Sequence, residues 1–447
     1  MSESASHIAP LPRDVRIGYG LGSVATGTFG TVPGLMLLPY LTDTLGIAAG
    51  VAGVIVFAPK AWDVILNPIA GRISDRSADP RGPRRPFLLK AGLLLALGFV
   101  LLFAGPPMGS RLGDGLWVLV MFVGCATAYA FFQVPYVAMP AEITDSYDER
   151  TRLMTWRVAI LALAIMLSGA TSPMIRNAFE GRTGYRVMGL FVACLLVAGV
   201  LGAYFGTRRA PVGTPHADSA SLRDQLRIVA AAKDFRLLLT TFVIQALGTG
   251  AMLAGVDYVA RTVLRNPGAA TILFVCFVGP ALLLTGAWSS LGQRIGKKRG
   301  YVLSSVVFAA GAVLLVGAGV APAWTTYVAT ALVGCGYAGA QVFPLAMLPD
   351  AAAVDARRTG HNRAGLYTGV WTAGETLGLA VGPGVFALVL SLGGYVSSTS
   401  GTVAQPDSAV KAIVLGFSLL PATLTLVSLL WLRRYSLSAA EVEGAWR

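Results

Sequence analysis

Charged residues are scarce in this chain of 447 residues. Asp, Glu, Lys and Arg together make up 13% of the sequence, whereas an average soluble protein has about 25%. Apolar residues make up 55%, and the mean hydropathy is +0.67. Apolar runs of about 20 residues recur along the chain, which predicts helices that cross a membrane. Alternating ten-residue segments typical of a membrane β-barrel are missing, as is any polar connection long enough for a soluble domain.

Histidine and cysteine are scarce as well. His7, His216 and His361 lie outside the predicted helices, which excludes a histidine proton relay within the membrane. The four cysteines each stand alone in an apolar run, so we expect buried thiols rather than disulfides. The sequence has no phosphate-binding loop, zinc-type cluster or nucleophile-elbow serine. We therefore expect no enzyme, no cofactor and no metal centre, and any work done across the membrane would draw on an ion gradient.

The apolar runs predict an all-α membrane protein with twelve transmembrane helices. These helices would span residues 16–45, 50–73, 87–106, 115–139, 153–175, 185–206, 235–262, 268–293, 300–320, 322–349, 363–393 and 409–433. Residues 1–206 would form one six-helix bundle and residues 235–447 a second, with a polar linker at 207–234. The basic loop after the second helix has a weak echo after the eighth, as two related bundles should show.

The cationic residues are unevenly distributed over the predicted loops. Of 35 Lys and Arg residues, 26 fall on the side that holds both termini and seven on the other. This asymmetry predicts a multi-pass protein of the inner (cytoplasmic) membrane with both termini in the cytoplasm. The net charge of +13 is then a signal of topology and an attraction to anionic lipid, not a nucleic-acid footprint. The first 12 residues lack the pattern of a signal peptide.

A carboxylate stands at membrane depth in the second predicted helix. Asp63 precedes Arg72 by roughly 13 Å of helix, which places it near the middle of a hydrocarbon core about 30 Å thick. Lys60, Asp63 and Asn67 are spaced i, i+3 and i+7 and share a helix face. A carboxylate at such depth is costly and indicates a functional ion site, with Lys60 as its nearest partner. The alternative is a structural pair that holds helices together.

Several other polar or aromatic side chains inside predicted helices are candidate solute contacts. Gln133 either lines a cavity or makes an interhelical hydrogen bond, and Arg157 either faces a cavity or extends to the membrane surface. Glu375 would lie near the midplane, where a lipid-facing carboxylate would be far more costly than a cavity-facing one. The full set of candidates is Gln133, Arg157, Glu375, Trp371, Gln341 and Tyr129.

Two basic loops on the predicted cytoplasmic side are candidate gates. A charge network that breaks and reforms there could alternate between two states, although these residues could also serve only to set topology. The candidates are Arg72, Asp75, Arg76, Arg84, Arg85, Arg294, Lys297 and Arg299. On the opposite side, the i, i+4 spacing of Asp257 and Arg261 predicts an ion pair near the membrane interface.

The run from Lys60 to Pro68, KAWDVILNP, resembles the second-helix motif of the glycoside–pentoside–hexuronide:cation symporter family, a branch of the major facilitator superfamily. Supporting matches lie at residues 19–22, 41–43, 133–136 and 359–367. The resemblance implies the major facilitator fold, alternating access between two bundles, and symport of a sugar or glycoside with a cation. The expected partners are therefore a small solute and the lipid bilayer, and we expect a monomer.

The resemblance also assigns roles to individual residues. Asp63 falls on a cation-binding carboxylate and Arg157 on an arginine of the family, whereas Asn67 replaces a second carboxylate found in a family member. Because one titratable group suffices for a proton, this replacement favours H⁺ over Na⁺ as the coupling ion. Gln133 and Gly27 fall where that member uses carboxylates for the sugar, so the galactoside chemistry of that member does not carry over. Glu375 stands where it has a lysine.

Two other functions remain open at this point. A sibling branch of the same family transports lysophospholipids, and the loss of polar groups from the first helix would suit such an amphiphilic solute. A membrane sensor that transports nothing is more remote, because it should carry a soluble signalling domain.

Overall fold

The computed structural model describes residues 11–77, 79, 82, 84–144, 147–210, 231–359, 364–399, 403–437 and 441. Within these residues every regular element is helical. Eleven helices are long and apolar enough to cross a membrane, and one bent pair raises the number to twelve. Each expected span has a counterpart, so the prediction of an all-α membrane protein is confirmed.

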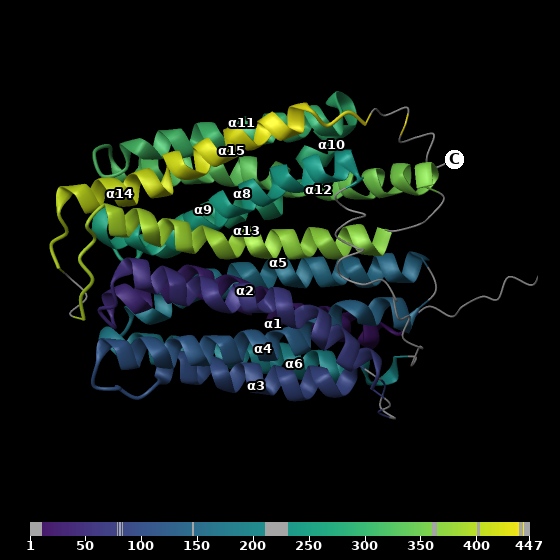
Figure 1. Ribbon diagram of the computed structural model, residues 1–447, viewed down its shortest axis with the longest axis horizontal. Coiled ribbons are helices and arrows are strands. Elements are labelled where there is room, and N and C mark those ends of the chain that lie inside the picture. The colour runs from purple at the N-terminus through teal and green to yellow at the C-terminus, as the bar shows by residue number, and fades with distance from the viewer. Residues whose placement is uncertain are drawn as a thin grey trace, which may run out of the picture. The chain divides into compact units, whose positions relative to one another are not determined.

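The first six spans follow one another with short connections (Figure 1). They are α1 (Arg13–Asp43), α2 (Ala49–Asp75), α3 (Arg85–Ala104), α4 (Arg111–Ile143), α5 (Tyr147–Asn177) and α6 (Gly181–Gly206), and a 3-10 turn η1 (Thr207–Arg209) follows. Local sequence explains some of the boundaries. Ser110 caps α4 by accepting a hydrogen bond from the backbone N–H of Gly113, and a proline stands in the first turn of α3, where its missing N–H costs nothing.

The remaining spans are more irregular. They are α8 (Lys233–Tyr258) with a π-helical turn η2 (Val259–Val263), α9 (Ala269–Leu283), α10 (Thr285–Ile295), α11 (Lys297–Leu314) with a 3-10 turn η3 (Leu315–Gly317), α12 (Ala323–Thr359), α13 (Ala364–Leu392), α14 (Asp407–Phe417) and α15 (Leu419–Arg433). The span expected at 268–293 is bent by 51° between α9 and α10. The helix expected to end at 349 continues as α12 to Thr359, with Pro344 and Pro349 inside it.

The chain forms two compact units. Unit 1 comprises residues 1–33 and 62–218, and unit 2 comprises residues 34–61 and 219–447. The C-terminal part of α1 and the first half of α2 therefore belong to unit 2. Close packing within unit 2 explains this grouping, because a Cβ added to Gly53 would lie only 2.7 Å from the Cβ of Ala387. The division into bundles at 1–206 and 235–447 stays a prediction.

Glycines allow the closest helix contacts in each unit. In unit 1 a Cβ on Gly18 would lie 2.3 Å from the Cα of Gly206, so α1 and α6 touch backbone to backbone. In unit 2 a Cβ on Gly382 would lie 2.4 Å from the backbone nitrogen of Ala251, which brings α13 equally close to α8. Small residues at such crossings are typical of helices packed in membranes.

Candidate functional site

Asp63 lies in the interior of unit 1. Its side chain is on α2 and is only 3% exposed. The charges of Asp63 and of Arg157 on α5 both act on Tyr129 of α4. Both charges therefore lie near the phenol of Tyr129, and these three residues predicted from the sequence share one region of unit 1.

Aromatic rings hold Arg157 within unit 1. Its guanidinium lies 5.7 Å from the centre of the Tyr136 ring, and this ring stacks on Tyr19 with a centroid distance of 4.7 Å. The Tyr136 hydroxyl donates to the backbone carbonyl of Tyr19 at 2.7 Å and is 2.9 Å from the hydroxyl of Ser23. A cation fixed over an aromatic face in this way gains about 0.5–2 kcal/mol. The contact favours an inward position of Arg157 over one at the membrane surface.

The other predicted residues of this half are Lys60 and Asn67 on α2 and Gln133 on α4. Asn67 and Gln133 are partly buried in unit 1. Lys60 is also partly buried and belongs to the segment of α2 that groups with unit 2. The roles of Lys60, Asn67 and Gln133 stay predictions.

Unit 2 contains a small pocket that includes two of the predicted residues, Glu375 and Gln341. About 20 Å³ of it is open to the centre of a water molecule, which is room for one water or one hydroxyl oxygen. Its walls combine aromatic, amide, hydroxyl and carboxylate side chains from α8, α11, α12, α13 and α15. They include Phe242, Gln245, Thr249, Phe308, Tyr337, Gln341, Glu375 and Thr425.

The hydrogen bonds around Gln245 fix the orientation of its amide in this pocket wall. Its Nε2 donates to the hydroxyls of Ser305 and Ser428, both at 3.0 Å. Each serine hydroxyl already donates its only proton to a carbonyl, Ser305 to Tyr301 at 2.8 Å and Ser428 to Thr425 at 2.6 Å. Both serine oxygens can therefore only accept, so the NH₂ group must face them.

The amide oxygen of Gln245 is left without a partner as a result. The residue is 5% exposed, and its Oε1 receives no hydrogen bond within the part of the chain that the structure describes. A buried acceptor in this state costs about 1–3 kcal/mol. The sequence shows Gln245 as a polar residue in a helix but cannot show how its amide is oriented, because the two serines lie 60 and 183 residues away.

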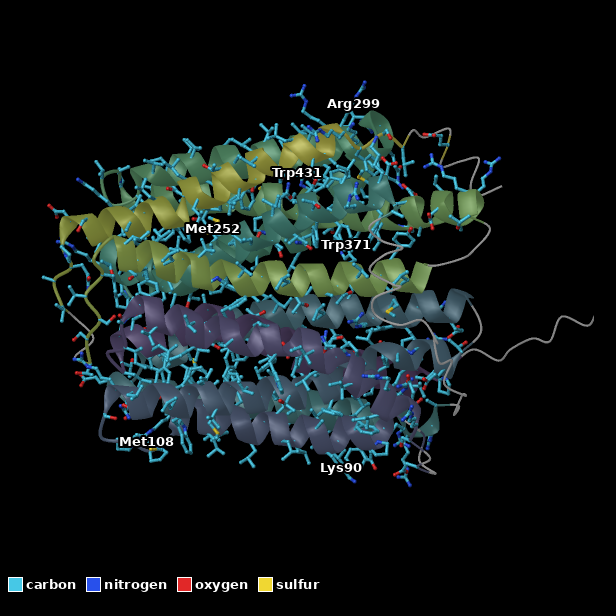
Figure 2. The ribbon with its side chains drawn as sticks, viewed as in Figure 1. Lys90, Met108, Met252, Arg299, Trp371 and Trp431 are labelled. Carbon is cyan, nitrogen blue, oxygen red and sulfur yellow. The ribbon has the colours of Figure 1, made fainter. Side chains whose placement is uncertain are left out.

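Trp371, a further predicted solute contact, lies in the hydrophobic core of unit 2 (Figure 2). It is 1% exposed and stacks on Phe242 with a centroid distance of 4.4 Å. Phe242 in turn lines the pocket. In this conformation Trp371 supports the pocket wall from behind, and direct contact with a solute would require the core to rearrange.

Some of the predicted gate residues form ion pairs or hydrogen bonds with other helices, whereas others are exposed. Arg84 pairs with Asp75 and Glu142, each at 2.6 Å. Burial lowers the pKa of the Arg84 guanidinium, but the hydrogen bonds and charges of Glu142 and Asp75 outweigh burial and raise that pKa. Arg85 donates to the carbonyl of Tyr204 at 3.0 Å and lies 5.0 Å from the centre of its ring.

Unit 2 has a matching pair, in which Lys297 lies 2.5 Å from Asp350. The four remaining candidates, Arg72, Arg76, Arg294 and Arg299, are exposed, and Arg299 projects away from the helices in Figure 2. Sequence analysis missed the acidic partners Glu142 and Asp350, which lie 58 and 53 residues from their cations.

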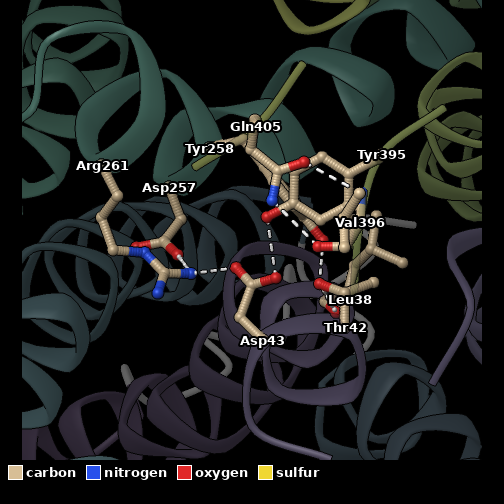
Figure 3. A network of polar contacts seen from close by, with 9 residues as sticks. All are labelled: Leu38, Thr42, Asp43, Asp257, Tyr258, Arg261, Tyr395, Val396 and Gln405. Atoms are coloured by element: carbon tan, nitrogen blue, oxygen red, sulfur yellow. Dashed lines mark hydrogen bonds and ion pairs between the residues drawn. The ribbon is translucent and has the colours of Figure 1, made fainter. Parts of the chain in front are cut away.

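A further charge network lies at the other end of unit 2 (Figure 3). Arg261 contacts Asp257 at 2.5 Å, which confirms the predicted i, i+4 pair. It also contacts Asp43, at the end of α1, at 2.6 Å, and Asp43 accepts a hydrogen bond from the hydroxyl of Tyr395 at 2.8 Å. Next to it, the hydroxyls of Thr42 and Tyr258 are 2.7 Å apart. The end of α1 is thus fastened to α8 and to the segment after α13.

A family model described as MFS/sugar transport protein matches residues 18–439. The chain belongs to this transporter family. The resemblance drawn from the motif at Lys60–Pro68 is thereby confirmed at the level of the family, and the protein is a multi-span membrane transporter.

Known relatives cover nearly the whole chain. The putative glycoside/cation symporter YagG of Escherichia coli (strain K12) is 26% identical over 97% of this chain and 94% of its own. The glucuronide carrier protein homolog of the same organism is 25% identical over 90% of both. Among solved structures, a D-xylose–proton symporter superposes with a TM-score of 0.71 over 96% of this chain and 98% of its own. At 12% identity that likeness shows the fold, which is the expected major facilitator fold.

Proposed function

We propose that the protein is a symporter that carries a sugar or glycoside together with a proton, and that Asp63 binds the proton. The observation that carries this proposal is the cluster in unit 1, where a 3% exposed carboxylate shares its surroundings with Tyr129 and Arg157. Relatives named for glycosides and a cation, and a fold shared with a xylose–proton symporter, support the same function.

The chemistry of the cluster suits a proton. A buried carboxylate can bind one proton and become neutral, which removes a negative charge from the surroundings of Tyr129, on which the charge of Arg157 also acts. A sodium ion would need several oxygen ligands around it, and Asp63 is the single carboxylate assigned to this cluster. Lys60 and Asn67, on the same helix, would adjust the proton affinity of Asp63.

Candidate solute contacts come from each unit separately. In unit 1 they are Tyr129, Gln133 and Arg157, which offer hydroxyl, amide and guanidinium groups for a polyhydroxylated solute. In unit 2 they are Gln341 and Glu375, with Trp371 as a support. The networks of Arg84 and Lys297 would serve as gates on the cytoplasmic side of the inner membrane, where we also place both termini.

The proposal is tested by transport into proteoliposomes. Wild-type protein should accumulate a radiolabelled methyl glycoside when an inward proton gradient is imposed, with no requirement for sodium. The variant Asp63→Asn should still exchange the glycoside across the membrane but should not accumulate it. The matched control is Asp14→Asn, which changes a half-exposed carboxylate of unit 1 and should leave accumulation intact.

Two results would contradict this function. Accumulation by Asp63→Asn at the wild-type level would remove the coupling role of Asp63. Uptake of lysophospholipids with none of any glycoside, by protein shown to be folded, would replace the sugar by an amphiphilic solute.

A further inference from the structure

Two stretches of the sequence that support the family resemblance, residues 19–22 and 133–136, meet inside unit 1. Tyr136 of α4 stacks on Tyr19 of α1 with a centroid distance of 4.7 Å, and both side chains are fully buried. A Cβ added to Gly22 would overlap the Tyr136 ring. The backbone of α1 thus leaves a slot for this ring because residue 22 is a glycine.

The hydroxyl group of Tyr136 fixes the ring further. It donates its only proton to the backbone carbonyl of Tyr19 at 2.7 Å. The hydroxyl of Ser23, 2.9 Å away, must therefore be the donor to the Tyr136 oxygen, which has only lone pairs left to offer. Ser23 is fully buried as well. Because Tyr136 is held at its ring and at its hydroxyl, it keeps one position relative to α1.

Arg157 of α5 lies over this fixed ring. Its guanidinium is 5.7 Å from the ring centre, and its hydrogen bond to the sulfur of Met154, at 3.9 Å, is to a weak acceptor. Within the part of the chain that the structure describes, no ion pair joins Arg157 to a carboxylate. The face of Tyr136 is therefore the main contact that fixes the guanidinium.

The position of this guanidinium matters because Arg157 is a candidate solute contact. Its charge acts on Tyr129, a second candidate solute contact, so the two groups lie in one region of unit 1. A guanidinium is planar, and its N–H groups point in fixed directions within that plane. A shift of the plane would misalign the hydrogen bonds to a solute although the positive charge would remain.

We propose that Tyr136 is a positioning residue for Arg157: its ring, seated on Gly22 and bonded to Tyr19, holds the guanidinium where it can bind the solute. The inference rests on the proposed function and deepens it, because it names a residue through which Arg157 reaches its binding position. It separates two properties of the transporter. Affinity for the solute should depend on the ring of Tyr136, whereas coupling should depend on the charges of Asp63 and Arg157.

The test is exchange of a radiolabelled solute in proteoliposomes at equal pH on both sides, so that coupling does not enter. The probe is methyl glucoside or methyl galactoside, whichever wild-type protein takes up faster. Tyr136→Leu removes the ring and should raise KM about tenfold with little change in the maximal rate, as expected for the loss of one hydrogen bond to a charged group. Tyr136→Phe keeps the ring and should stay within about threefold of the wild-type KM.

A second buried tyrosine of unit 1 provides the matched control. The ring of Tyr185 lies 5.5 Å from the guanidinium of Arg176 and stacks on Phe103 with a centroid distance of 6.0 Å. Tyr185→Leu breaks the same kind of contact away from the candidate solute residues. It should lower the melting temperature about as much as Tyr136→Leu does, but it should leave KM unchanged.

Two glycine variants test the position of the ring without removing a functional group. Gly22→Ala adds a methyl group that must displace the ring of Tyr136, and it should raise KM at least about threefold, because a small misplacement of a binding group is costly. Gly30→Ala, on the same helix, meets open space and should leave KM unchanged. If Tyr136→Leu does not fold, this pair of variants still decides.

A double-mutant cycle shows whether Tyr136 acts through Arg157. In protein that already carries Arg157→Gln, adding Tyr136→Leu should change KM by less than about twofold. An unchanged KM in folded Tyr136→Leu, or an equally large rise in the Arg157→Gln background, would overturn the positioning role but leave a sugar symporter. Wild-type protein that takes up neither methyl glycoside would contradict the proposed function and, with it, this inference.

Discussion

Asp63 in unit 1 and Glu375 in unit 2 are both carboxylates within apolar helices, and their surroundings are very different. Asp63 in unit 1 lies near the phenol of Tyr129, on which the cation of Arg157 also acts. Glu375 in unit 2 shares its pocket with amides, hydroxyls and aromatic rings. A neighbouring cation can balance the charge that a proton adds or removes, whereas a pocket without a cation suits a neutral hydrogen-bonding group. The comparison supports our proposal that Asp63 in unit 1 binds the coupling proton, whereas the pocket of Glu375 in unit 2 suits a neutral group.

The charge networks at the expected cytoplasmic ends of the two units also differ, in burial and in the number of acidic partners. The side chain of Arg84 is 7% exposed and has two acidic partners, whereas that of Lys297 is 46% exposed and has one. Because a carboxylate removed from water needs a counter-charge, the acidic partners of Arg84 are stable in the fold only while Arg84 is present. An exposed pair is replaced by water with little loss.

The largest expected effect on stability comes from removing the buried cation of one candidate gate, compared with the exposed cation of the other. Arg84→Gln leaves Glu142 without its buried partner and should lower the free energy of unfolding by about 3–5 kcal/mol. Lys297→Gln should lower it by less than about 1 kcal/mol. Thermal or SDS unfolding of the purified proteins measures both. Equal losses in the two variants would show that the burial of Arg84 is not what makes its network stable.

A smaller effect concerns Arg157, whose charge acts on Tyr129 together with that of Asp63. Arg157→Lys keeps the positive charge but loses the flat guanidinium that stacks on Tyr136, which should cost about 0.5–2 kcal/mol in stability. Proton-driven accumulation should survive in this variant, whereas Arg157→Gln should weaken it. Both are measured by the same unfolding and uptake assays. Loss of coupling in Arg157→Lys as complete as in Arg157→Gln would mean that geometry, not charge, is what Asp63 requires.

The smallest expected change in stability belongs to the pocket of unit 2. Gln245→Met removes two hydrogen bonds to serines but also removes the unpaired Oε1, so the free energy of unfolding should change by less than about 1 kcal/mol. Thermal or SDS unfolding of the purified variant measures this change. A loss above about 2 kcal/mol would show that the two hydrogen bonds outweigh the cost of the unpaired oxygen.

The sequence alone was sufficient for the spans and for local pairs. The apolar runs predicted all twelve segments, and the i, i+4 spacing predicted the pair of Asp257 and Arg261. The sequence analysis missed the 51° bend between α9 and α10, although Pro280 inside α9 and Gly286 at the start of α10 are residues at which helices can kink. It ended α12 too early, because Pro349 lies inside that helix although proline usually marks a boundary.

Ion pairs between residues far apart in the sequence could not be predicted for a different reason. Asp43 lies 218 residues from Arg261, and Glu142 lies 58 residues from Arg84, so only the packing of helices brings these charges together. The same holds for the site in unit 2. Glu375 and Gln341 could be chosen because they are polar within apolar helices, whereas the fixed amide of Gln245 depends on serines from two other helices.

The most direct measurement of the central claim is accumulation of a neutral methyl glycoside driven by a pH gradient, compared between Asp63→Asn and Glu375→Gln. If unit 1 holds the coupling proton, Asp63→Asn brings the internal solute only to the external concentration, while Glu375→Gln still accumulates it and responds to the direction of the gradient. Accumulation that survives in Asp63→Asn but is abolished in Glu375→Gln would contradict the account and move the proton to unit 2.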